Sequence, residues 1–165
     1  MHENAHDVLK DWVNKNQEFV DSAKIAELGC QDVNGNILEI IPTRTGFDLM
    51  EDASVDVVIE PGIIPEDHKH IYDLVVTVSS FQFCPNPHVY IKEILDLLKP
   101  DGKLFLLTCG YSCIHKTAHV FFSKEALTLL FSQHFDILEI DQRGEVAPDR
   151  HCDTILIAQV KHDTN

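Results

Sequence analysis

The feature that most constrains this chain is a series of short apolar runs that recurs along nearly its whole length. The runs are almost continuous in Val, Ile and Leu, as is typical of strands that are buried on both faces. Seven candidate strands follow one another, at residues 24–30, 45–49, 55–60, 72–80, 102–108, 135–140 and 154–160. Because parallel strands are usually covered by the helices that connect them, the pattern predicts an α/β fold with a mostly parallel seven-stranded sheet.

Helical patterns separate the later strands. Residues 5–20 place apolar side chains three and four positions apart, which predicts one amphipathic helix before the first strand. Asn86 and Pro87 predict the start of a second helix, and Ser123 predicts the start of a third. The early connections are shorter: residues 31–43 leave room for about two or three helical turns, and residues 50–54 leave room for none. We therefore expect trimmed helices on that side of the sheet.

Length and charge limit the class of protein. We expect a single domain over residues 1–165, with an N-terminal helix at 1–22 and a core at 24–160, because a chain of this size can bury one core. Thirteen Lys and Arg against 27 Asp and Glu give a formal charge of −14, which disfavours nucleic acid and membrane surfaces as partners. No segment reads as a secretory signal or as a bilayer-spanning run of roughly 20 apolar residues. These features predict a cytoplasmic location.

Two strand ends carry residues that suit a nucleotide. The sequence KIAELGC leads one strand into a turn at Gly29, where backbone amides can approach an anionic group at the start of a following helix. The next strand, TGFDL, ends with Asp48, a position where an acidic side chain accepts hydrogen bonds from ribose hydroxyls. The ordinary structural alternatives are that Gly29 only forms a tight turn and that Asp48 is a solvated turn residue. Together, the Gly29 turn and Asp48 favour a nucleotide-binding site at the carboxyl ends of these strands.

The order of ELGC, GFDL, the acidic end of VDVVIE, YDLVVTVSS and LLKPDGKLFLLT resembles the class I S-adenosylmethionine-dependent methyltransferases, in particular the broad family often labelled methyltransferase type 11. The resemblance covers residues 24–160 and implies a three-layer Rossmann-like methyltransferase fold. It also implies S-adenosylmethionine as cofactor and methyl transfer to a small molecule or a protein side chain. A noncatalytic binding or partner module with this fold is the alternative, and association with a second copy or another subunit stays open. A nicotinamide-dependent oxidoreductase is disfavoured because the chain lacks the G-x-G-x-x-G turn.

The resemblance also implies roles for individual residues at the strand ends. Glu27 and Gly29 would shape the loop around the methionine part of the cofactor. Asp48 would hold the ribose, and Leu49 would flank the adenine. Glu60 looks like the family's acidic residue that approaches the adenine amine.

The methyl-transfer end of the expected site departs from the family pattern. Ser79 would lie beside the reactive methyl group. Gln31, counted with the cofactor-binding residues, occupies the position of the family's second loop glycine. Gln82 and Phe83 stand where members often have an acidic residue and a His, so a base is missing there.

A polar cluster follows the fifth strand. Cys109, Cys113, His115 and His119 have a spacing that could be drawn as a zinc site, but burial of Cys109 beside an apolar run is the simpler interpretation, and we expect no metal. His115 and His119 are candidate general bases, with a solvated loop His as the alternative. Since the sulfonium cofactor supplies the reactive group and the protein aligns the acceptor, a dedicated base is optional.

Overall fold

The computed structural model describes residues 3–32, 36–109, 122–143 and 153–161. Within these ranges seven strands form one sheet in the order β3-β2-β1-β4-β5-β7-β6. Strand β7 pairs antiparallel with β5 and β6, whereas the pairs from β3 to β5 are all parallel. The bounds are β1 Ile25–Leu28, β2 Thr45–Asp48, β3 Val57–Val58, β4 Tyr72–Val78, β5 Leu98–Cys109, β6 Phe135–Arg143 and β7 Asp153–Val160. The seven predicted strands and the mostly parallel α/β sheet are confirmed.

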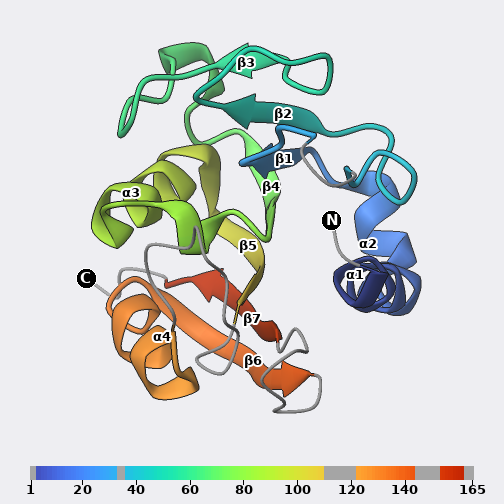
Figure 1. Ribbon diagram of the computed structural model, residues 1–165, viewed down its shortest axis with the longest axis vertical. Coiled ribbons are helices and arrows are strands. Elements are labelled where there is room, and N and C mark those ends of the chain that lie inside the picture. Colours follow the sequence, from blue (N-terminus) through green and yellow to red (C-terminus); the bar gives the residue numbers. More distant parts are fainter. Residues whose placement is uncertain (1–2, 33–35, 110–121, 144–152, 162–165) are drawn as a thin grey trace.

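Helices cover the two faces of this sheet and complete three layers. Figure 1 shows α3 (Pro87–Leu97) and α4 (Lys124–Phe131) on one side, and α1 (Glu3–Lys15) and α2 (Gln17–Ser22) on the other. Two short 3-10 helices, Glu66–His68 and Phe81–Phe83, lie before and after β4. In the described part of the chain, no helix is long and apolar enough to span a membrane.

Two apolar cores follow from the alternation of side chains along the strands. In β1, Ala26 and Leu28 face the core beneath α3 and α4, whereas Ile25 faces the core beneath α1 and α2. In β5, Leu104 and Leu106 belong to the first core, and Phe105 and Leu107 belong to the second. The sheet is thus buried on both faces, which explains the continuous apolar runs.

The predicted helix caps are present. The Asn86 side chain accepts a hydrogen bond from the backbone N–H of His88, and Pro87 occupies the first turn of α3. The Ser123 side chain accepts from the backbone N–H of Ala126 at the start of α4. Each cap satisfies a backbone donor that the helix itself leaves unpaired.

The N-terminal segment forms two helices, so the prediction of one helix over residues 5–20 is wrong at its centre. Asn16 separates α1 from α2, with a φ of −121°. Its side-chain amide donates to the Trp12 carbonyl at 2.8 Å. Asn commonly offers the backbone such an alternative hydrogen bond, and here it ends the first helix.

The connection between β1 and β2 contains no helix in its described residues, although its length leaves room for about two or three helical turns. Instead the N–H groups of Ile40 and Ile41 both reach the Ile37 carbonyl, at 2.9 and 2.8 Å, in a single turn. Ile37 and Ile41 are buried in the core with α1 and α2, which pulls the segment onto the sheet. The 50–54 connection also lacks a helix, as predicted.

Candidate functional site

The central feature of the candidate site is the meeting of three strand ends. Strand β1 pairs in parallel with β2 on one side and with β4 on the other, so the order of the strands reverses between β1 and β4. Ligands of open α/β sheets bind in the crevice outside the carboxyl ends of the strands at such a reversal. Gly29, Asp48 and Ser79 follow or end these three strands.

The turn after β1 requires glycine for two reasons. Gly29 has a φ of +80°, a conformation that residues with a Cβ rarely adopt. A Cβ at this position would also lie 2.4 Å from the Cβ and Oγ of Ser80. The Gly29 N–H donates to the Phe47 carbonyl at 2.8 Å, which ties the turn to β2. The turn is therefore pressed between the ends of β2 and β4.

A cluster of three hydroxyls supports this turn from below. The hydroxyls of Thr77, Ser80 and Tyr90 lie 2.7 Å from one another, and those of Ser80 and Tyr90 also reach the Leu28 carbonyl, at 3.2 and 3.0 Å. Burial raises the pKa of Tyr90, so its hydroxyl stays protonated and can donate. The cluster joins β1, β4 and α3 directly beneath Gly29.

Asp48 lies where a ribose-binding residue was predicted, and its carboxylate organises the loop ends. Oδ2 accepts the Gln31 N–H at 3.0 Å, and Oδ1 accepts the N–H groups of Leu49 and Met50 at 2.7 and 3.3 Å. A carboxylate has about four acceptor positions, so these three bonds leave little spare capacity. Asp48 remains half-exposed. It therefore connects the turn after β1 to the end of β2.

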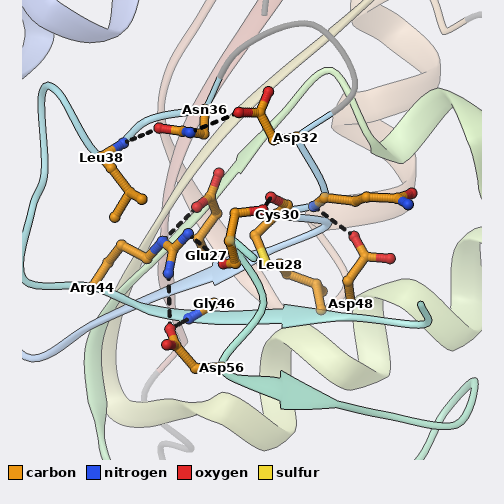
Figure 2. Close-up of polar contacts among 12 residues, drawn as sticks. Glu27, Leu28, Cys30, Asp32, Asn36, Leu38, Arg44, Gly46, Asp48 and Asp56 are labelled. Carbon is orange, nitrogen blue, oxygen red and sulfur yellow. Dashed lines mark hydrogen bonds and ion pairs between the residues drawn. The ribbon is translucent and has the colours of Figure 1, made fainter. Parts of the chain in front are cut away.

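Glu27 is tied to a buried arginine. Its Oε2 accepts from Arg44 Nε at 2.7 Å, and Arg44 also donates to Asp56 Oδ2 at 2.8 Å and to the Ser54 carbonyl at 2.7 Å. Figure 2 shows Arg44 between Glu27 and Asp56. Burial raises the pKa of Glu27 to about 7, although the Arg44 guanidinium opposes the rise. Glu27 thus supports the loop from inside the fold.

The anion site that the sequence suggested is built differently. A turn followed by a helix start was expected after Gly29, but the described residues between β1 and β2 form no helix. The Gln31 N–H, which such a site would direct at a ligand, is bonded to Asp48. Gln31 itself is not among the residues with positive φ, so the backbone here does not require the family's second glycine.

The two predicted adenine contacts lie at the edge of the sheet near β3. Leu49 is 51% exposed and directly follows Asp48. Glu60 is exposed and pairs in an isolated β-bridge with Ile63. The loop after Glu60 is held by α3, because the Gly62 N–H donates to the buried Glu93 carboxylate at 2.6 Å. Burial raises the pKa of Glu93.

Ser79 ends the β4 segment with an unusual backbone. Its φ is +56°, and its carbonyl accepts a hydrogen bond from the Gln82 side chain at 2.9 Å. Gln82, predicted only as the replacement of a missing acidic residue, is 1% exposed. Phe83 is partly exposed.

Several residues of this region were not predicted from the sequence, among them Arg44, Tyr90 and Glu93. Arg44 had a faint signal, since it is the only Lys or Arg between Lys24 and Lys69 in a stretch rich in acidic residues. Tyr90 and Glu93 had none, because both read as ordinary positions of an amphipathic helix.

The polar cluster after β5 falls almost wholly outside the described residues. Cys113, His115 and His119 cannot be placed, so their proposed roles as bases, and the expected absence of a metal, stay predictions. Cys109, the last residue of β5, is 2% exposed. This agrees with the interpretation of Cys109 as a residue buried beside an apolar run.

Comparisons with known proteins agree with this geometry. Residues 65–106 match the family model described as a methyltransferase domain. No curated protein sequence matches the chain.

Solved structures show the same fold over nearly the whole chain. The 1,6-didemethyltoxoflavin-N1-methyltransferase of Burkholderia thailandensis is 14% identical, with a TM-score of 0.76 over 97% of this chain and 80% of that one. The N-methyltransferase NodS of Bradyrhizobium japonicum, solved with S-adenosylhomocysteine, is 12% identical, with a TM-score of 0.66 over 97% and 100%. A possible histamine N-methyltransferase of Thermotoga maritima is 14% identical, with a TM-score of 0.67 over 95% and 100%.

The strand order, the parallel pairing with one reversed strand and the matched segment from residue 65 to 106 all point the same way. The resemblance predicted from the sequence is thereby confirmed: the chain has the fold of solved S-adenosylmethionine-dependent methyltransferases, and residues 65–106 match the methyltransferase domain model.

Proposed function

We propose that this chain binds S-adenosylmethionine at the carboxyl ends of β1, β2 and β4 and transfers its methyl group to a small molecule or a protein side chain. The observation that carries the proposal is the convergence of Gly29, Asp48 and Ser79 at the reversal of strand order. The charge of −14 argues against nucleic acid as the acceptor.

The residues present fit the cofactor's adenosine part. The Gly29 turn lets the chain pass close to Ser80 without a side chain, and half-exposed Asp48 keeps a carboxylate at the end of β2 for the ribose hydroxyls. Leu49 offers an exposed apolar side chain beside it for the adenine, and Glu60 lies near the next strand end for the adenine amine. When bound, the cofactor supplies a sulfonium methyl group that an acceptor atom can attack.

The protein's own contribution is binding and alignment. Asp48 accepts hydrogen bonds from the Gln31 and Leu49 amides, so these two positions are already fixed to the end of β2 without a ligand. Ser79 lies at the β4 end, where the acceptor would approach. Gln82 carries an amide and cannot act as a base. A base, where the acceptor needs one, would come from His115 or His119.

A noncatalytic binding module is the second candidate, and particular contacts favour it. Three amides occupy the Asp48 carboxylate, and Glu27 is bonded to Arg44 instead of being available to a ligand. Both candidates require binding of the cofactor. Only the first requires methyl transfer, so comparison of binding with turnover separates them.

The decisive experiment is calorimetric titration with S-adenosylmethionine and S-adenosylhomocysteine. Asp48→Ala should weaken binding about tenfold to a hundredfold, because a charged hydrogen-bond acceptor contributes roughly 1.5–3 kcal/mol. Glu51→Ala is the matched control: it removes a nearby exposed carboxylate and should leave affinity unchanged. No binding of either ligand at millimolar concentration would refute the proposal. Unchanged affinity in Asp48→Ala would show that the ribose lies elsewhere.

A further inference from the structure

The strongest unexplained feature near the site is the backbone of Ser79. Only Ser79 and His70, among the described residues other than glycine, have positive φ values. A residue with a Cβ is strained there and keeps such a conformation only when its surroundings impose it. Such strain clusters at ligand sites, so the contacts that impose it are informative.

Two hydrogen bonds hold both polar backbone groups of Ser79. Its N–H donates to the Leu107 carbonyl at 2.8 Å, which continues the ladder from β4 to β5. Its carbonyl accepts from Gln82 Nε2 at 2.9 Å. Gln82 Oε1 in turn accepts from the Thr108 hydroxyl at 3.0 Å. The chain of contacts therefore runs from β5 through Gln82 to Ser79.

Gln82 is itself held firmly. Gln82 and Thr108 are 1% and 0% exposed, so neither can exchange its partner for water. The preceding residue, Phe81, is fully buried, and its ring stacks on Phe122 at a centroid distance of 4.8 Å. The 3-10 helix of Gln82 is thus anchored in the core beneath α3 and α4.

Only a side chain that both donates and accepts fits this place. An amide donates through nitrogen to the Ser79 carbonyl and accepts through oxygen from the Thr108 hydroxyl. A carboxylate could only accept, and it would face the Ser79 carbonyl without a proton to share. This requirement gives a physical reason for an amide at Gln82.

Ser79 also borders the turn after β1. The next residue, Ser80, is the one that a Cβ on Gly29 would strike at 2.4 Å. A change of the Ser79 backbone would therefore shift the contact between the ends of β1 and β4. This is the crevice in which the proposed cofactor would lie.

We propose that Gln82 is a positioning residue, which holds Ser79 in its left-handed conformation and so sets the wall of the cofactor crevice between β1 and β4. The inference rests on the proposed function. It assigns Gln82 no contact with the reacting atoms.

A double-mutant cycle tests the proposal. Gln82→Met keeps the length of the side chain and removes both hydrogen bonds. It should weaken S-adenosylhomocysteine binding about tenfold, measured by calorimetry, which corresponds to about 1.4 kcal/mol. In a Ser79→Gly background the same change should cost less than about threefold, since glycine adopts positive φ without help. In a Ser79→Ala background, which lacks the hydroxyl but keeps the Cβ, the loss should again be about tenfold.

The cycle separates strain from other effects. An equal loss in all three backgrounds, or no loss in any, would overturn the proposal. Urea unfolding without ligand keeps it distinct from the proposed function. Gln82→Met should lower the midpoint in the parent and the Ser79→Ala background, and much less in the Ser79→Gly background. If the parent binds neither ligand, the proposed function fails. The urea midpoints still test whether Gln82 restrains Ser79, and equal shifts in all three backgrounds would contradict that restraint.

Discussion

The two faces of the sheet are built differently around β1 and β2. On the face of α3 and α4, Leu28 and Phe47 enter a continuous apolar core. On the opposite face, Glu27 and Gly46 are covered by Arg44, whose guanidinium leaves no room for a Cβ on Gly46. Around these two strands, apolar packing covers one face, and a buried ion pair covers part of the other.

This difference shows what covers β2 on the face where the described residues provide no helix. The described residues of the connection from β1 to β2 form turns, and none of them belongs to a helix that could cover β2 on that face. Arg44 covers it instead and is only 8% exposed. A buried ion pair tolerates the loss of one partner poorly, because the remaining charge is stranded. The two faces should therefore respond differently to substitution.

Loss of Arg44 should have the largest effect. Arg44→Met strands the buried Glu27 carboxylate and should lower the free energy of unfolding by about 3–5 kcal/mol, measured by urea unfolding at pH 8. Lys15→Met, which breaks the exposed Lys15–Asp11 pair, is the control and should cost less than about 1 kcal/mol. Adding Glu27→Leu to Arg44→Met should recover part of the loss. Equal losses of stability in Arg44→Met and Lys15→Met would contradict the idea that the buried ion pair stabilises this face.

On the packed face, a cavity should be the most harmful change. Leu127 in α4 is fully buried, and Leu127→Ala should cost about 2–5 kcal/mol. Leu129 lies in the same helix and is 70% exposed, so Leu129→Ala controls for helix propensity and should cost far less. Urea unfolding of both variants measures the difference. Similar losses would mean that α4 does not pack as described.

The ion-pair face should also respond to pH. Burial raises the pKa of Glu27 from 4.5 to about 7, so between these values the folded state binds more protons than the unfolded state. Stability contributed by this group is present below pH 4.5 and falls as pH rises towards 7. Relative to Glu27→Gln, the parent should lose on the order of 2 kcal/mol across this window. The prediction is wrong if the difference in free energy of unfolding between the parent and Glu27→Gln stays constant from pH 4.5 to 8.

The hydroxyl cluster beneath Gly29 should give the smallest effect. Tyr90→Phe removes one of three mutually bonded hydroxyls and should cost about 1 kcal/mol in urea unfolding, because Thr77 and Ser80 can still bond each other. His88→Phe, at an exposed position of the same helix, is a suitable control. A loss as large as that of Leu127→Ala would show that this cluster, and not packing, dominates the α3 face.

Local signals in the sequence determined much of the fold and part of the site. Apolar runs located all seven strands, and Asn86 and Ser123 located two helix starts, because these patterns depend on neighbouring residues. Gly29 and Asp48 were placed at strand ends for the same reason. The motif order also indicated a methyltransferase fold, which the comparisons confirm.

Tertiary structure alone decided which side chains meet. Arg44 and Glu27 are 17 residues apart, Gln82 and Thr108 are 26 apart, and the Tyr90 hydroxyl reaches a carbonyl 62 residues away. Their partners depend on how strands align in the sheet, and no local period records that alignment. The turn that replaces a helix in the described residues after β1 has the same origin, because Ile37 and Ile41 are buried against the sheet. Long-range contacts, not local propensity, thus set the details of the site.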